Sequence, residues 1–322
     1  MKAGAVVALW LVATSWVWTT QQGIYEDHKV MHAAQASAAP SLWQARGLMR
    51  WSIWQQARFA PSPLAMRVVN LALSGLVIGL VALLAFRLGL PVWLTAAVMA
   101  CHPLTVETIA MLSGRAELIA AIGVLLACVA ATWRTAWRWL VMPLGLGLGW
   151  LGKETAVVGV ALVPLLLRRP WLTMGATVAL LVAAWDWRYA GVATSAPPQP
   201  MLDWLLLQSA AVMRLVSQGI VPVGLTPDAD IDAISRGLQV ASLASLMALT
   251  IVGMRMWRQR PLVAIGLLWI MIVVAPRLFV QTPRSYLNAH HFYLALPGVA
   301  LLVSASVNHR RSFYAKAESC AA

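Results

Sequence analysis

The sequence predicts an all-α fold: a polytopic transmembrane helix bundle of about ten spans. Of its 322 residues, 61% are hydrophobic and 11% are charged, whereas a soluble domain has about 45–50% apolar and about 25% charged residues. That composition leaves too little polar surface to cover a protein in water, so lipid must be the solvent for much of the exterior. The 17 tryptophans support the same conclusion, because tryptophan is enriched where a membrane meets water.

Ten apolar runs account for the predicted spans. The first, Ala3–Thr19, also fits a signal peptide, but no convincing small-x-small cleavage site ends it, so we interpret it as a retained span. Several runs are shorter than the ~20 residues of a straight span and are expected to continue through flanking polar residues. The other nine runs are Leu64–Phe86, Val92–Cys101, Leu118–Thr132, Trp139–Leu151, Thr155–Leu167, Trp171–Trp185, Leu238–Met254, Leu262–Ala275 and Phe292–Ser306.

Basic residues set the expected orientation. The net charge of +13 would indicate a nucleic-acid partner in a soluble protein, but here we attribute it to cytoplasmic loops, which are rich in lysine and arginine. With the N-terminus inside, the inner face carries twelve basic residues and a single acid, Glu318. We therefore predict no nucleic-acid partner. The twelve basic residues are Lys2, Arg87, Arg134, Arg138, Arg168, Arg169, Arg255, Arg258, Arg260, Arg310, Arg311 and Lys316.

The chain divides into one transmembrane domain, residues 1–308, and a short basic cytoplasmic tail, residues 309–322. The compact length and the lack of repeats favour the inner (cytoplasmic) membrane of a bacterium. We expect both termini in the cytoplasm and the long polar loops on the outer, periplasmic face.

One segment, Leu202–Val221, is apolar enough to span but contains Asp203, Gln208, Arg214 and Gln218. If it crossed the membrane, the basic cluster from Arg255 to Arg260 would be exported, against the positive-inside rule. We therefore predict a re-entrant or interfacial helix within an outer loop of residues 188–236.

The first outer loop, residues 20–62, has two halves. In the second half, Ser41–Phe59, three tryptophans are interleaved with three arginines, which predicts an amphipathic helix on the outer interface; a plain linker is the alternative. The first half contains the adjacent carboxylates Glu26 and Asp27.

Further ionisable residues lie at the outer ends of the predicted spans, and such residues are costly at membrane depth. They are therefore functional candidates. The alternative is that Lys153 pairs with Glu154, and Arg115 with Glu107 or Glu117, simply to neutralise charge. His102, which precedes a proline, could equally end a helix and pack. The candidates are His102, Glu107, Arg115, Glu117, Lys153, Glu154, Asp228 and Asp230.

A family resemblance runs through these residues. The stretch HPLTVETIAMLSGRAELIAAIGVLLA, from His102 to Ala127, resembles a signature of the GT-C polytopic membrane glycosyltransferases. It is similar to the membrane portion of the transmembrane and tetratricopeptide-repeat O-mannosyltransferases and their bacterial relatives. The resemblance covers about residues 20–300. Further matching stretches are Tyr25-Glu26-Asp27, the run RWSIWQQARFAPSPLAMRVVNLALSGL with Asn70, LGKETAVVGVALVPLLL, and RLVSQGIVPVGLTPDADI.

Three departures accompany the resemblance. The family usually has two aspartates where this chain has Glu26-Asp27. Near the last span the family commonly has an arginine, and here Asn288–Leu294 stands in its place without one. No 34-residue helical repeats follow the last span.

The resemblance implies transfer of a sugar, with a mannose-like hexose possible, from a polyprenyl-phosphate donor to an acceptor hydroxyl on the outer face. Asp27 is the expected general base, with Glu26 beside it. Fixed cations would stabilise the phosphate as it leaves. The expected phosphate-binding residues are Arg115, Lys153, Arg284, His290 and His291, and His102, Glu107, Glu117, Glu154, Asp228 and Asp230 are expected to support them.

A metal cofactor is not favoured. The three cysteines show no zinc or disulfide spacing. Four acids, Glu26, Asp27, Asp228 and Asp230, could bind a hard divalent cation, but relatives that use monophosphate lipid donors often need none. The expected partners are the bilayer, the lipid-linked donor and a protein or glycan acceptor.

Two other functions remain open at this point. One is a catalytically inactive GT-C relative that acts as an assembly subunit, which the altered motifs would fit. The other is a transporter or flippase for a lipid-linked sugar. Transporters often carry internal repeats with broken helices in corresponding positions, and the sequence has no such symmetry.

Overall fold

The computed structural model describes residues 2–15, 30–32, 35, 38–43, 46–187, 200–223, 234–279 and 289–307. Within these residues all regular structure is helical and no strand occurs. The first half contains α1 (Lys2–Ala13), α4 (Gly47–Phe59), α5 (Pro63–Arg87), α6 (Val92–Cys101), α7 (Pro103–Ala110), the 3-10 turn η1 (Leu112–Gly114), α8 (Arg115–Ala131) and α9 (Arg138–Gly152). The second half contains η2 (Glu154–Val158), α10 (Gly159–Leu166), α11 (Pro170–Trp187), α12 (Met201–Ile220), α13 (Arg236–Gln259), α14 (Pro261–Val274), η3 (Ala275–Leu278), η4 (Ala289–Ala295) and α15 (Leu296–Val307).

Every predicted apolar run is helical in its described part, but not every helix is long enough to cross a membrane. Four helical stretches are long and apolar enough, and the pair α6 and α7, bent by 54°, would make a fifth. The fold is thus that of an all-helical membrane protein with four to five candidate spans. The prediction of ten spans is not confirmed, because α1, α10, α11 and α15 contribute only shorter apolar helices. The four long stretches are Pro63–Arg87, Leu112–Ala131, Arg236–Gln259 and Pro261–Leu278.

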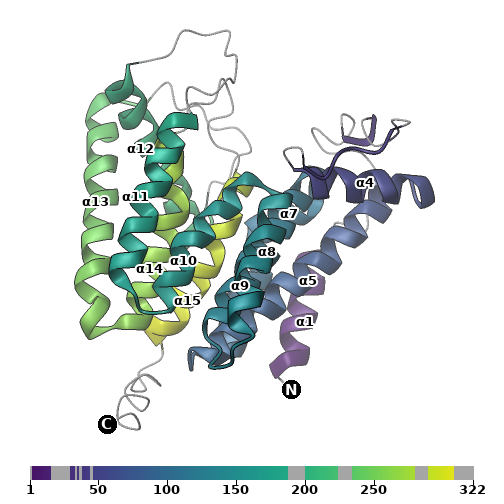
Figure 1. The fold of residues 1–322 in the computed structure, drawn as a ribbon, viewed down its shortest axis with the longest axis horizontal. Coiled ribbons are helices and arrows are strands. Elements are labelled where there is room, and N and C mark those ends of the chain that lie inside the picture. Colours follow the sequence, from purple (N-terminus) through teal and green to yellow (C-terminus); the bar gives the residue numbers. More distant parts are fainter. Residues whose placement is uncertain are drawn as a thin grey trace.

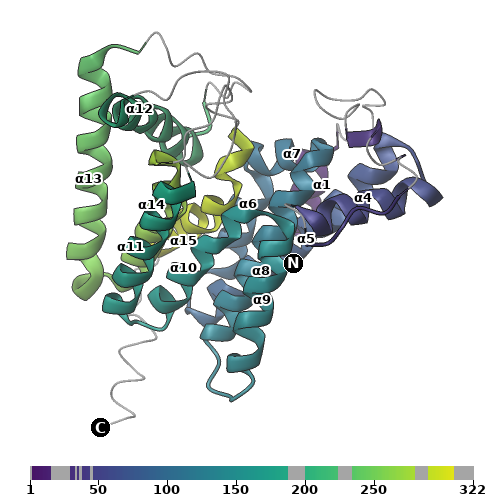
Figure 2. The ribbon, with the colours of Figure 1, turned by 45° about the horizontal axis from the view of Figure 1, so that its top comes forward.

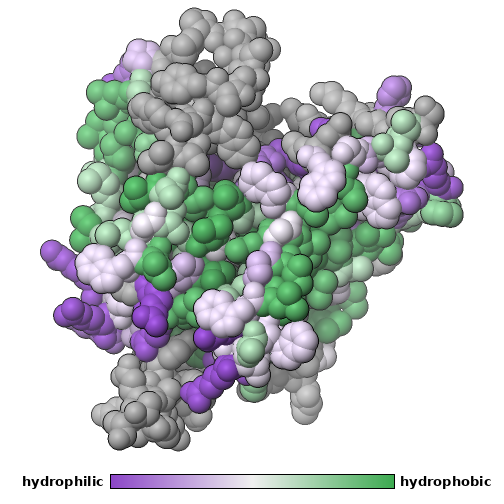
Figure 3. All heavy atoms as spheres, in the orientation of Figure 1, coloured by the Kyte–Doolittle hydropathy of each residue, from purple (hydrophilic) through white to green (hydrophobic). Residues whose placement is uncertain are grey.

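The helices stand side by side, and their connections divide between two ends (Figure 1). The short basic connections, such as those from α8 to α9 and from α13 to α14, lie at the lower end in this view. The helix α4 lies at the upper end. Hydrophobic residues cover the middle of the face in Figure 3, with hydrophilic ones near its lower edge and upper right. This banding is what a bundle in a bilayer requires.

The helix α8 lies at the centre of the bundle, and glycines bring α9 against it. A Cβ atom on Gly123 of α8 would lie 2.2 Å from the Gly149 nitrogen and 2.4 Å from the Gly145 oxygen. Gly145 and Gly149 are four residues apart on α9, the small-xxx-small spacing that lets membrane helices approach closely. Gly152, one turn further, meets Ile119 in the same way, at 2.7 Å. This contact fixes how the end of α9 sits against the start of α8.

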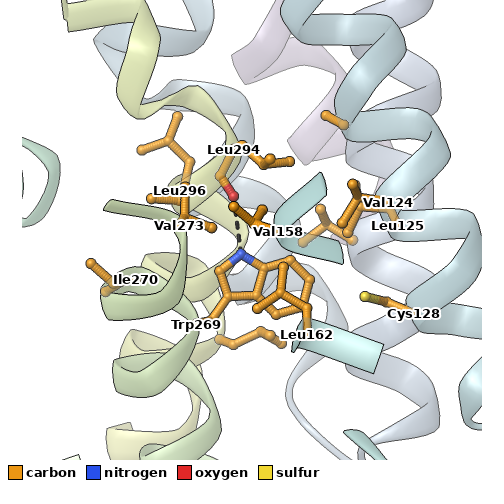
Figure 4. Close-up of a cluster of buried hydrophobic side chains, with 14 of the residues drawn as sticks. Val124, Leu125, Cys128, Val158, Leu162, Trp269, Ile270, Val273, Leu294 and Leu296 are labelled. Carbon is orange, nitrogen blue, oxygen red and sulfur yellow. Dashed lines mark hydrogen bonds between the residues drawn. The ribbon is translucent and has the colours of Figure 1, made fainter. Parts of the chain in front are cut away.

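A buried aromatic residue joins the second half of the chain to α8. Trp269 of α14 is fully buried, and its Nε1 donates a hydrogen bond of 3.0 Å to the Leu294 carbonyl (Figure 4). Its neighbours in Figure 4 include Leu162 of α10 and Cys128 of α8. The indole thus satisfies its only polar atom inside an otherwise apolar cluster.

The predicted interfacial segments are both single helices. α4 carries Trp51 and Trp54, and the Arg58 guanidinium lies 3.5 Å from the centre of the Trp54 ring. α12 covers almost the whole of Leu202–Val221 and is not among the candidate spans. Figure 2 looks partly along α12 while α13 lies across the view, so these two helices are not parallel. The re-entrant or interfacial placement of α12 in the membrane stays a prediction.

Candidate functional site

A group of charged residues gathers where α8 begins and α9 ends, at the upper end of the bundle in Figure 1. We call it the charge cluster. Two ion pairs form its centre, and a further arginine interacts electrostatically with both carboxylates. The charge cluster consists of Arg46, Glu117, Lys153, Glu154 and Arg277.

Lys153 donates a hydrogen bond to Glu117, and both side chains are almost fully buried. The pair joins the residue that follows α9 to the first turn of α8. The expected alternative, in which Lys153 pairs with Glu154, is wrong. Lys153 has an extended backbone, with φ −159° and ψ 143°, whereas Glu154 begins η2, and the two side chains form ion pairs with different residues.

Glu154 is paired instead with Arg46, at 3.1 Å between Oε1 and Nη2, and this pair is partly exposed. Arg46 precedes α4 and has left-handed backbone dihedrals, φ 59° and ψ 32°. A Cβ atom on the following residue, Gly47, would lie 2.1 Å from the Leu42 oxygen, so only glycine fits there. The entry to α4 is therefore folded tightly enough to bring Arg46 to the charge cluster.

Arg277 of η3 completes the charge cluster. Its side chain is half-buried and interacts electrostatically with Glu117 and Glu154. It forms no hydrogen bond or salt bridge with any residue that the structure describes. The sequence analysis missed Arg277, although the signal was present: it is an ionisable residue at the end of an apolar run.

Arg115 lies in a separate, uncharged site. Its side chain is 1% exposed, and its guanidinium donates four hydrogen bonds. The acceptors are Asn70 Oδ1 at 2.9 Å, Ser52 Oγ at 3.3 Å, Gln56 Oε1 at 2.8 Å and the Met66 carbonyl at 2.9 Å. None of these acceptors is charged, so pairing with Glu107 or Glu117 was the wrong alternative. Arg115 ties α4 and α5 to the start of α8.

The break between α7 and η1 is held by two buried polar residues of α5. Asn70 donates to the carbonyls of Ile109 at 3.2 Å and Met111 at 3.0 Å, and Arg67 donates to that of Ala110 at 3.0 Å. The Ile109 and Ala110 carbonyls belong to the last turn of α7, where carbonyls have no partner within the helix. The buried polar residues of α5 thus stabilise the turn that positions Arg115.

His102 has a structural role, because its two ring nitrogens form hydrogen bonds within the fold. It ends α6 and caps α7, with its Nδ1 accepting from the Leu104 amide at 3.2 Å. Its Nε2 lies 3.0 Å from the Gly219 carbonyl of α12. Because Nδ1 accepts, Nε2 carries the proton and donates, so His102 is a neutral link between the bent pair and α12.

The other predicted site residues are not among the described residues of the two sites above. Glu107 is half-buried on α7. His290 and His291 lie in η4, but only their backbone is described. Outside the described residues lie Glu26, Asp27, Asp228, Asp230 and Arg284.

In the described part of the chain, no three His, Cys, Asp or Glu residues come together as a metal site would require. The four acids considered as cation ligands lie outside that part. The expectation that no metal is needed therefore stays a prediction.

Comparison with known proteins found no matching family model, no matching curated protein and no matching solved structure. The resemblance to the GT-C glycosyltransferases is therefore carried by the sequence motifs alone.

Proposed function

We propose that this protein is a glycosyltransferase that moves a sugar from a polyprenyl-phosphate donor to an acceptor hydroxyl at the outer face of the membrane. The observation that carries the proposal is the charge cluster. In the described residues it combines three cations with two carboxylates, Glu117 and Glu154. Cations held next to a bilayer attract an anionic headgroup.

The location of the charge cluster supports a lipid-linked substrate. It lies at the end of the bundle opposite the short basic connections, such as the one at Arg260 (Figure 1). By the positive-inside rule that opposite end faces outward. A polyprenyl chain could lie against the apolar flank of the bundle while its phosphate reaches the charge cluster.

The chemistry assigned to the chain is a single displacement. The Asp27 carboxylate takes the proton of the acceptor hydroxyl as that oxygen bonds to the anomeric carbon. The bond from the anomeric carbon to the phosphate oxygen breaks, and its electron pair leaves with the polyprenyl phosphate. Fixed cations stabilise this leaving group. A single displacement inverts the anomeric centre.

The predicted phosphate-binding residues differ in their contacts, and these contacts support different roles for them. Arg115 uses four of its five N–H groups within the fold, so we assign it a positioning role. Lys153 donates a hydrogen bond to Glu117. A phosphate that binds Lys153 would therefore bind next to the Glu117 carboxylate. Arg284, His290 and His291 remain candidates.

The test is release of polyprenyl phosphate by the detergent-solubilised protein, measured with a panel of polyprenyl-phosphate sugars and acceptor hydroxyls. Wild type should turn over one donor, and Asp27→Asn should lose about 100-fold or more, as expected for a general base. The matched control is Asp203→Asn. Asp203 is an exposed carboxylate in a 2.7 Å pair with Arg236, and its loss should leave turnover unchanged.

Other outcomes would favour the alternatives. Equal turnover in wild type and the Asp27 variant would exclude Asp27 as the base. Movement of intact donor across vesicle membranes without release of polyprenyl phosphate would indicate a transporter. No turnover and no movement with any donor would favour the inactive relative.

A further inference from the structure

Arg277 differs from the other two cations of the charge cluster in its hydrogen bonds and ion pairs. Lys153 and Arg46 each make an ion pair with their own carboxylate. Arg277 makes no hydrogen bond or salt bridge with any described residue, although it lies within electrostatic reach of both Glu117 and Glu154. A guanidinium carries five N–H donors, and a half-buried one pays a desolvation cost until acceptors are supplied.

The fold holds Arg277 where a ligand can reach it. It lies in η3, which directly follows α14 and packs against α11 and α12. α14 begins next to Arg260 at the lower end of the bundle, so η3 lies at the upper end, beside the charge cluster. The Arg277 side chain is only partly exposed, so a ligand there would be partly shielded from water.

The chemistry of arginine indicates what the ligand is. Arg277 lies beside two carboxylates, Glu117 and Glu154, that are already paired with Lys153 and Arg46. A sugar linked to a lipid through one phosphate is a phosphodiester and carries one negative charge. Its free oxygens accept the paired N–H donors of an arginine, which are shaped for phosphate.

We propose that Arg277 binds the phosphate of the lipid-linked donor. The inference rests on the proposed function for the identity of the ligand. It assigns the phosphate to a residue outside the motifs that suggested a glycosyltransferase. Lys153 and Arg46 then neutralise the two carboxylates beside Arg277 through their ion pairs.

The experiment measures equilibrium binding of a short-chain polyprenyl phosphate to the full-length protein in detergent, with the matching polyprenol as the uncharged probe. Arg277→Gln should weaken phosphate binding by roughly tenfold or more, as expected for a lost charged hydrogen bond, and leave polyprenol binding unchanged. Arg260→Gln is the matched control. It removes an exposed arginine at the other end of the bundle and should bind like wild type.

A second variant tests whether weaker binding reflects misfolding. Arg277→Lys keeps the positive charge beside Glu117 and Glu154 but loses the planar pair of donors, so it should fold like wild type and still bind phosphate severalfold more weakly. The proposal is overturned if both Arg277 variants bind polyprenyl phosphate as tightly as the Arg260 variant. It is also overturned if phosphate and polyprenol binding fall together.

The outcome is distinct from that of the transferase assay. Arginine-dependent phosphate binding without sugar transfer would support Arg277 and count against the transferase. Sugar transfer with unaltered phosphate binding in both Arg277 variants would support the transferase and remove Arg277 from its site.

Discussion

Lys153 and Glu117 are 36 residues apart in the chain and form a buried ion pair where α9 meets the first turn of α8. The pair depends on the close contact of these two helices, in which Gly152 lies against Ile119. The packing of α9 against α8 therefore determines which charged residues of the candidate site are paired.

Loss of one partner of this pair should be strongly destabilising. Lys153→Met leaves Glu117 buried without its cation, which typically costs about 3–5 kcal/mol. The double variant with Glu117→Leu should recover most of that stability, because it buries no unpaired charge. The measurement is thermal unfolding in detergent, followed by tryptophan fluorescence. The control, Arg236→Met, breaks the exposed pair with Asp203 and should cost at most about 1 kcal/mol; a comparable loss in both single variants would contradict the prediction.

Arg115→Lys should loosen α4 from the bundle. A lysine has three donors without a planar fork, so it cannot serve the four acceptors that Arg115 reaches. We expect a loss of about 1–3 kcal/mol and faster amide hydrogen exchange in Gly47–Phe59. Arg50→Lys, an exposed substitution on the same helix, should change neither. Unaltered exchange in the Arg115 variant would show that the four bonds do not hold α4.

Gly123→Ala should disrupt the contact between α8 and α9. The added methyl group would lie 2.2 Å from the Gly149 nitrogen, so the helices must move apart, at a cost of about 1–3 kcal/mol or more. Gly147→Ala is the matched control, since nothing lies within 4 Å of its Cβ position. It should be neutral or stabilise by up to about 1 kcal/mol, because alanine favours a helix. Equal melting temperatures for the two variants would refute a close glycine contact.

Two substitutions of His102 should separate its two bonds. His102→Asn can still cap α7 but cannot reach the Gly219 carbonyl, whereas His102→Ala loses both interactions. We expect the alanine variant to be the less stable of the two by about 1 kcal/mol, in thermal unfolding at neutral pH. If the two variants melt together, the cap contributes little.

The orientation of the bundle can be tested by cysteine labelling in intact cells. The native cysteines, Cys101, Cys128 and Cys320, are first replaced by alanine. A cysteine at the exposed Leu42, near the start of α4, should then react with a membrane-impermeant maleimide from outside. A cysteine at Arg260 should react only after the membrane is permeabilised. The reverse pattern would place the charge cluster in the cytoplasm and exclude an outer-face enzyme.

The sequence predicted the helices well because each helix is determined locally. An apolar run such as Leu64–Phe86 cannot leave its backbone amides unbonded in lipid, so it must be helical, and it is. The position of His102 before a proline likewise predicted a helix boundary. Helix lengths were harder to predict, because a run shorter than a span gains or loses its last turns through packing.

The residue composition and the order of apolar and basic segments thus determined that this is an all-helical membrane protein with ionisable residues near one end of its helices. Only the tertiary structure decided which of those residues meet. Lys153 and Glu154 are neighbours in sequence but form ion pairs with different residues, Glu117 and Arg46. Lys153 reaches Glu117, and Arg277 approaches both carboxylates, because helices far apart in the chain pack side by side.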